Sequence, residues 1–142
     1  MPSDSCLSVL VVEGCERSRG ALRTLINEEH GLCLAAEAQT GAAALDSFIR
    51  HRPDIVMVGV CLPDVSGLEL VKRIRQTDAR CVLILVGTWP DPFVEKVGRL
   101  LGATEVCHKG SGLNRIREVL RGRIQASSAQ RLSAEAARRT TP

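Results

Sequence analysis

The stretch that decides the fold is RPDIVMVGVCLPDVSGLELVKRIR, residues 52–75. Residues 54–60 form an almost continuous apolar run, which is typical of a strand covered on both faces of a sheet. The residues that follow place Leu68, Val71 and Ile74 at helical spacing, with Ser66 as the expected N-cap. The stretch therefore predicts a buried strand followed directly by a helix.

The same alternation is repeated along the chain. Apolar runs cover residues 8–12, 32–37, 54–60, 81–87 and 105–108. The helical stretches have apolar faces formed by Ala21, Leu22, Leu25 and Ile26, by Ala42, Leu45, Phe48 and Ile49, by Leu68, Val71 and Ile74, by Phe93, Val97, Leu100 and Leu101, and by Leu113, Ile116, Leu120 and Ile124. We expect Gly31 to end the first helix, Pro53 to limit the second and Ser111 to cap the fifth. The order predicts an α/β fold, (βα)₅, with a doubly wound five-stranded parallel sheet in three layers.

Composition and charge limit the kind of protein. A chain of 142 residues that is 44% hydrophobic and 25% charged is expected to form one compact soluble domain. Its apolar runs are shorter than the roughly 20 residues of a membrane-spanning helix, and its start lacks the basic region of a secretory signal, so we expect a cytoplasmic location. The net charge of +3 divides into −2 over residues 1–114 and +5 over residues 115–142.

The chain divides into three parts. Residues 1–6 are an N-terminal start, and residues 7–124 hold the whole alternating pattern. Residues 125–142, QASSAQRLSAEAARRTTP, lose the apolar period and have Leu132 as their one large apolar residue. We expect these last residues to be a linker or flexible tail rather than part of the core.

Several site classes are disfavoured. The chain has no P-loop, no G-x-G-x-x-G after a strand and no G-x-S-x-G elbow. Its histidines, His30, His51 and His108, stand alone, and its cysteines are scattered singly without metal spacing. Four cysteines lie in or beside apolar runs, where we expect small buried hydrophobes: Cys33, Cys61, Cys81 and Cys107. Cys6 and Cys15 are the other two, and nothing in the sequence favours a redox role.

Three segments carry a resemblance to a known family. VLVVEGCERSRGALRTLI (9–26), the stretch quoted above (52–75) and VLILVGTWPDPFVEKVGRLLGATEVCHKG (82–110) resemble, in order and spacing, the receiver domain of bacterial two-component response regulators. The resemblance covers about residues 7–124 and implies a flavodoxin-like fold. It also implies a site at the strand ends: an acidic pair that holds Mg²⁺, an aspartate that accepts a phosphoryl group, a Thr or Ser, an aromatic switch residue and a lysine.

This sequence departs from the family at most of these positions. The acidic pair falls on Glu13 and Gly14, which leaves Glu13 as the one remaining metal candidate, and the acceptor position falls on Gly59. The Thr/Ser position falls on Val86, the aromatic position falls on Val106, and Lys109 alone matches the family. We expect no catalytic residue, no cofactor, and Mg²⁺ binding that is lost or weak. Phosphoryl transfer depends on in-line positioning, so a displaced carboxylate is a poor substitute.

Neighbouring groups offer little replacement. Asp64 is expected to point away from the strand ends, Asp54 lies at the opposite end of its strand, and Thr88 reaches the site only if its loop bends. Glu13 and Lys109 are expected to pair with each other across the empty pocket as a structural ion pair. A residual anion-binding role for Lys109 is the alternative.

The favoured function is that of an atypical receiver, or pseudo-receiver, which acts as a protein-interaction or dimerisation module and not as an enzyme. The resemblance locates contacts on the face formed by the fourth helix, fifth strand and fifth helix, which here would include Val94, Lys96, Arg99, Arg115 and Arg117. The segment RLSAEAARR (131–139) is similar to the linker that joins such receivers to LuxR-type helix-turn-helix domains. The alternative is therefore the regulatory half of a LuxR-type transcriptional regulator, which contacts DNA only through a further domain. An active phosphorelay receiver is the least favoured reading.

Overall fold

The computed structural model describes residues 6–110 and 112–140. Five parallel strands form one sheet in the order β2-β1-β3-β4-β5. The strands are β1 (Leu7–Val12), β2 (Leu32–Ala38), β3 (Ile55–Gly59), β4 (Val82–Gly87) and β5 (Glu105–His108). The helices are α1 (Glu16–Glu28), α2 (Gly41–His51), α3 (Gly67–Thr77), α4 (Pro92–Leu101) and α5 (Asn114–Thr140). The predicted three-layer (βα)₅ fold is confirmed.

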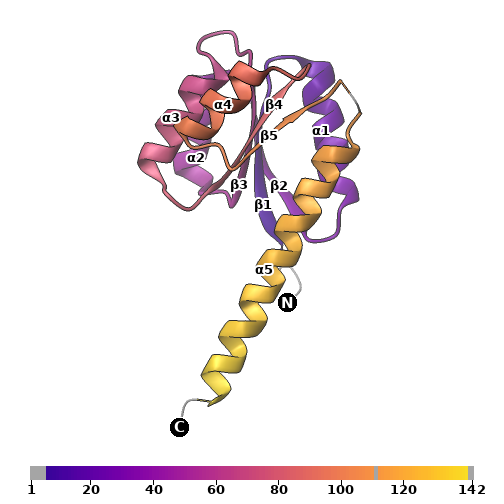
Figure 1. The fold of residues 1–142 in the computed structure, drawn as a ribbon, viewed down its shortest axis with the longest axis vertical. Coiled ribbons are helices and arrows are strands. Elements are labelled where there is room, and N and C mark those ends of the chain that lie inside the picture. The colour runs from indigo at the N-terminus through magenta and orange to yellow at the C-terminus, as the bar shows by residue number, and fades with distance from the viewer. Residues whose placement is uncertain (1–5, 111, 141–142) are drawn as a thin grey trace.

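The sheet separates two apolar cores. Figure 1 shows the helices that cover it on its two sides. Alternate residues of β1, such as Val9 and Val11, pack with α1 and α5, whereas Leu10 and Val12 pack with α2, α3 and α4. β3 is buried along its whole length, because helices cover both of its faces. In the described part of the chain, no helix is both long and apolar enough to cross a membrane.

Two of the predicted helix boundaries, the start of α3 and the end of α2, are confirmed. Ser66 caps α3 by accepting a hydrogen bond from the Leu68 amide at 3.0 Å, and α2 ends at His51, before Pro53. Gly31 adopts a φ of +100°, but α1 already ends at Glu28, so the prediction that Gly31 caps this helix is wrong. The predicted cap Ser111 lies outside the described residues.

Several residues predicted to face the core are exposed instead. Phe93 and Leu100 of α4 are 67% and 75% exposed, and Ile49 of α2 is 61% exposed. Ala21 and Ala42 are also exposed. In α4 the reason is Gly98: it is buried, and a Cβ there would lie 2.8 Å from Leu85 Cδ2, so the helix packs on the sheet through this glycine. The side of α4 that faces the sheet is therefore the side of Gly98, and Phe93 and Leu100 point outward.

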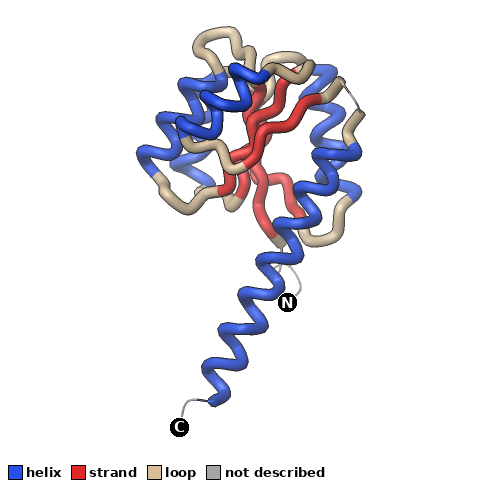
Figure 2. Tube along the Cα trace, in the orientation of Figure 1, coloured by secondary structure: helices blue, strands red, loops and turns tan. Residues whose placement is uncertain are grey.

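Helix α5 continues past residue 124, where the apolar period ends. Ile116, Val119 and Leu120 are buried against the sheet, but residues 129–139 are exposed (Figure 2). The segment expected to be a flexible tail is therefore helical through Thr140, although it stays outside the core as expected. Alanine, arginine and glutamate favour a helix by themselves, which explains a helix without an apolar face.

Candidate functional site at the strand ends

The positions singled out in the sequence meet at the carboxyl edge of the sheet. Glu13 follows β1, Gly59 ends β3, and Lys109 follows β5. Gly59 lies opposite Val86 of β4, and Gly87 lies opposite His108 of β5. Right-handed crossovers place the loops after parallel strands at one edge, so this clustering follows from the topology.

Glu13 occupies the space beside Gly59. A Cβ built on Gly59 would lie 2.8 Å from Glu13 Oε2 and 3.0 Å from Glu13 Cδ, closer than atoms of folded proteins normally approach. Glu13 is only 5% exposed. A glycine at position 59 thus leaves room for the Glu13 carboxylate, which lies where a side chain of residue 59 would begin.

Lys109 neutralises this carboxylate. Its Nζ lies 3.0 Å from Glu13 Oε1, and it also donates a hydrogen bond to Ser18 Oγ at 2.8 Å. The predicted Glu13–Lys109 pair is therefore present. Ser18, in the first turns of α1, was missed, because nothing in the sequence shows that it faces a lysine 91 residues away.

A hollow of about 270 Å³ opens beside this pair. It is lined by Glu13, Lys109 and Thr88, and by apolar side chains that include Val86 and Trp89. Val86 is 1% exposed and has no hydroxyl, and Val106 is half-buried in the core with α4. Thr88 does reach the edge of the hollow, as its loop allows. Trp89 was missed, although a lone tryptophan two residues after a strand end was a usable signal.

The other carboxylates of this region are engaged elsewhere. Asp64 accepts hydrogen bonds from the amides of Gly41 at 2.8 Å and Ala42 at 3.0 Å, and these bonds lower its pKa. Asp54 accepts a hydrogen bond from the Ser8 amide at the opposite end of the sheet. Both aspartates thus lie as predicted, away from the Glu13–Lys109 pair.

The residues at the strand ends do not fit a magnesium site. Mg²⁺ prefers several oxygen ligands, commonly from carboxylates. Here Glu13 supplies one carboxylate, already paired with Lys109, and Gly14 and Gly59 supply none. Among residues 6–110 and 112–140, no three His, Cys, Asp or Glu side chains are arranged to hold a metal ion.

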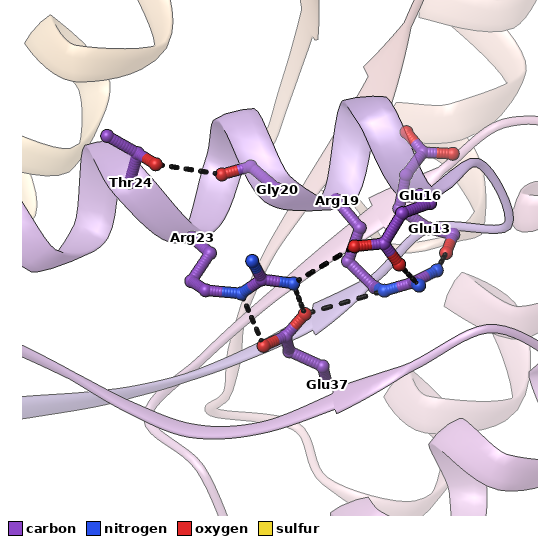
Figure 3. A network of polar contacts seen from close by, with 7 residues as sticks. All are labelled: Glu13, Glu16, Arg19, Gly20, Arg23, Thr24 and Glu37. Atoms are coloured by element: carbon purple, nitrogen blue, oxygen red, sulfur yellow. Dashed lines mark hydrogen bonds and ion pairs between the residues drawn. The ribbon is translucent and has the colours of Figure 1, made fainter.

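An arginine network joins the start of α1 to Glu13 and to Glu37 of β2 (Figure 3). Arg19 is 5% exposed, donates to the backbone oxygen of Glu13 at 2.8 Å, and pairs with Glu16 and with Glu37. Arg23 makes two hydrogen bonds to Glu37, at 2.7 and 2.8 Å, which lower the pKa of Glu37. The network holds the backbone of Glu13 against α1, and it was not predicted.

Two residues of the predicted contact face are engaged within the domain. Arg117 is turned toward α1, where it pairs with Glu29 at 2.7 Å and Glu28 at 3.2 Å. Val94 is half-buried and lines the hollow. The remaining residues, Lys96, Arg99 and Arg115, are exposed on α4 and α5. Arg117 therefore stabilises the α1–α5 contact and does not belong to the α4 side.

The ion pairs of Glu29 with Arg117 and Arg121 should make the stability of the protein depend on pH. Hydrogen bonds from Arg121 and then Arg117 lower the pKa of Glu29, whose side chain is 7% exposed. The folded state therefore binds fewer protons than the unfolded state around the usual glutamate pKa of about 4.3. We expect Glu29→Gln to be less stable than the wild type at pH 7, and the difference to shrink as pH falls below about 4.3.

Urea unfolding at several pH values measures this difference. The matched control is Glu118→Gln, because Glu118 is an exposed glutamate on α5, the helix that carries Arg117 and Arg121. Its stability should follow the wild type at every pH. A Glu29→Gln penalty that is the same at pH 3 and pH 7 would contradict the prediction, since it would not depend on the charge of Glu29.

Most of the chain matches a known protein family. Residues 9–121 match the family described as the response regulator receiver domain. The chain belongs to this family. The receiver is 31% identical over 107 residues to a protein-glutamate methylesterase/protein-glutamine glutaminase of Syntrophus aciditrophicus (strain SB), a match that covers 74% of the chain and 31% of that relative. The chain thus spans less than a third of the length of the methylesterase.

Solved structures show the same fold. A two-component response regulator of the LuxR family from Aurantimonas sp. SI85-9A1 superposes with a TM-score of 0.80 at 22% identity, covering 94% of this receiver and 99% of that chain. A CheY-like receiver domain from Methanospirillum hungatei JF-1 gives a TM-score of 0.78 at 16% identity, covering 89% and 99%. These likenesses confirm the flavodoxin-like receiver fold.

Proposed function

We propose that this receiver does not accept a phosphoryl group and acts as a protein-interaction module in a two-component-type pathway in the cytoplasm. The observation that supports the proposal is the Glu13 carboxylate, which lies beside Gly59 and is neutralised by Lys109 at 3.0 Å. No acceptor side chain exists at Gly59, and the lysine is already engaged. Cofactors are not expected, and Mg²⁺ binding should be lost or weak.

A constitutive role follows from this pairing. A modification shifts a two-state protein only through a difference in its interactions with the two states. Gly59 offers no covalent input, and Val86 and Val106 lack the hydroxyl and the aromatic ring that couple such an input to the surface in the family. The internal ion pair instead supplies Lys109 with a permanent carboxylate partner. The module therefore presents one surface state.

The surface we propose for contact lies on α4, β5 and α5 (Figure 1). Phe93 and Leu100 expose most of their side chains on α4, and Lys96 and Arg115 add positive charge. Exposed apolar side chains mixed with basic groups favour a protein partner. A second copy of this chain or a different protein would fit this surface.

Leu100→Glu tests the contact surface. A buried charge opposes association, so we expect the variant to weaken self-association or partner binding by at least about tenfold, equal to about 1.4 kcal/mol. Sedimentation or pull-down measures the effect. The matched control is Ile49→Glu on α2, since Ile49 is comparably exposed on another side. Equal loss in both variants, or no loss in Leu100→Glu, would contradict this location.

A second candidate is the regulatory domain of a LuxR-type regulator. It is favoured by the basic helical segment 131–139 at the end of α5, and one similar structure is described as LuxR family. In that case DNA is contacted only through another domain. Sequencing the gene beyond the codon of Pro142 distinguishes the two, because a helix-turn-helix there would favour the regulator.

Trp89 gives a direct optical test of the proposal. It is the one tryptophan of the chain, which has no tyrosine, and it lines the hollow with Glu13 and Lys109. Titration of the chain with Mg²⁺ should leave the Trp89 emission unchanged apart from the ionic-strength effect given by NaCl. A saturable change specific to Mg²⁺ would contradict the expected loss of the metal site.

A further inference from the structure

The hollow of about 270 Å³ at the strand ends has apolar walls from several segments of the chain. Val60 follows β3, Val86 lies in β4 and Val94 lies in α4. Trp89 comes from the loop between β4 and α4. An apolar cavity of about 150 Å³ holds one benzene ring, so the hollow has room for about two fused rings. Its volume lies near the lower end of the range of small-molecule sites.

Trp89 is an exposed aromatic side chain that is held in place at this hollow. It is 69% exposed, and its ring lies against Gly110, where a Cβ would lie 2.7 Å from Trp89 Cζ3. A glycine at position 110 therefore leaves room for the ring. A side chain that is already ordered loses little conformational entropy when a ligand packs on it. Trp89 thus offers a prepared surface for an aromatic ligand.

A polar atom without a partner lies next to the hollow. In the described part of the chain, His108 Nδ1 is buried and has no hydrogen-bond partner. His108 lines a recess of about 20 Å³, which shares Trp89, Pro90 and Val94 with the hollow. This volume holds one water-sized group, and a buried polar atom is stabilised when it gains a hydrogen bond. A hydroxyl group suits the recess, because it satisfies Nδ1 in either tautomer of the histidine.

The charges around the hollow balance, which favours a neutral ligand. Lys109 is paired with Glu13 at 3.0 Å. The Asp91 carboxylate accepts hydrogen bonds from the amides of Phe93 and Val94, at the start of α4. The N-terminus of a helix stabilises a negative charge in this position. An anionic ligand would meet two carboxylates and no unpaired cation among the residues that line the hollow.

The exposed thiol at the hollow corrects one expectation and limits the choice of probe. Cys61 lines the hollow and is exposed, not buried as expected, because it lies beyond the end of β3. Cys33 is also exposed, on the edge strand β2, whereas Cys81 and Cys107 are buried as expected. Probes for the hollow should therefore carry no thiol-reactive group.

We propose that the hollow binds a small neutral molecule that has an aromatic body of about two fused rings and a hydroxyl group. The rings pack against Trp89 and the valine side chains, and the hydroxyl enters the recess and hydrogen-bonds to His108 Nδ1. The bound molecule becomes part of the surface beside α4, so it requires no second conformation of the module. The inference goes beyond the proposed function and does not depend on it, because neither Trp89 nor His108 belongs to the Glu13–Lys109 pair.

Titration of the full chain with three naphthalene probes at pH 7 tests the proposal. The probes are 2-naphthol, which is neutral, 2-naphthoate, which is anionic, and 2-naphthylmethylamine, which is cationic. Trp89 is the one tryptophan, so its indole N–H gives a single, assigned cross-peak in ¹H–¹⁵N spectra. We expect 2-naphthol to shift this peak saturably with a Kd of about 1 mM or tighter. Both charged probes should bind at least about tenfold more weakly, because burial of an unpaired charge is unfavourable.

Variants locate the bound probe, and saturation-transfer NMR titration of 2-naphthol measures their affinity. Trp89→Ala should weaken binding about tenfold, whereas Trp89→Phe keeps an aromatic ring and should retain most of the affinity. His108→Phe should weaken binding about fivefold, because it removes Nδ1 and keeps a ring of similar size. The matched control is Ile49→Ala, which shortens an exposed apolar side chain on α2 and should bind like the wild type.

Three results would overturn the proposal. They are the absence of a saturable shift up to the solubility limit of 2-naphthol, tighter binding of either charged probe, and unchanged affinity in Trp89→Ala or His108→Phe. Phosphoryl transfer from acetyl phosphate is measured separately. A chain that binds 2-naphthol and also gains a phosphoryl group would contradict the proposed function alone, and a chain that does neither would contradict this inference alone.

Discussion

Replacing Gly59 with aspartate is expected to destabilise the protein by about 2–3 kcal/mol, although the family carries an aspartate at this position. The new Cβ would lie 2.8 Å from Glu13 Oε2, so the Glu13 side chain must move. The new carboxylate also places a second negative charge beside a mostly buried one, and like charges at close range are unfavourable. Urea unfolding of Gly59→Asp at pH 7 measures the loss.

A control at an open glycine separates these effects from the substitution itself. A Cβ at Gly122, on α5, meets no atom within 4 Å, so Gly122→Asp adds the same side chain without a clash. Its stability should stay within about 0.5 kcal/mol of the wild type, as for most surface substitutions. If Gly59→Asp were as stable as Gly122→Asp, the result would contradict the finding that the Glu13 carboxylate fills the space that a side chain at position 59 needs.

Replacing Lys109 with methionine is expected to cost about 3 kcal/mol at pH 7, because it leaves the Glu13 carboxylate buried without its cation. The Glu13 side chain is 7% exposed, and Lys109 Nζ is its ion-pair partner at 3.0 Å. The methionine keeps most of the apolar stem of the lysine, so the loss reports mainly the charge. Urea unfolding of Lys109→Met gives the value.

The double variant shows whether the pair acts as a unit. Glu13→Gln combined with Lys109→Met removes both charges, so we expect it to be more stable than Lys109→Met alone. The coupling free energy from the double-mutant cycle should be about 1–2 kcal/mol. Additive losses would contradict a direct interaction between the two side chains.

The fold could be predicted from the sequence where burial on both faces decides the element. Each central strand is an apolar run, and β3 is buried from Ile55 to Gly59. The buried faces of the helices were harder to predict, because Phe93 and Leu100 have the spacing of a core-facing side but are exposed. The deciding feature is the close packing of α4 on the sheet at Gly98, where a Cβ would lie 2.8 Å from Leu85 Cδ2, and a glycine carries no hydrophobic signal.

The site could be predicted in its main feature and not in its surroundings. Glu13 and Lys109 were expected to pair because parallel strands end at one edge, which requires no knowledge of side-chain conformation. Ser18 and Arg19 were missed, since their contacts depend on how α1 is placed and which way each side chain turns. Arg117 was assigned to the wrong face for the same reason.

The most direct test of the account is phosphoryl transfer to the wild-type chain. The protein is incubated with acetyl phosphate and Mg²⁺, alongside a receiver that has the acceptor aspartate, and the intact mass of each is measured. We expect the control receiver to gain a phosphoryl group and this chain to keep its mass, because Gly59 carries no acceptor and Glu13 is paired with Lys109. Stoichiometric addition of a hydroxylamine-labile phosphoryl group to this chain would contradict the account.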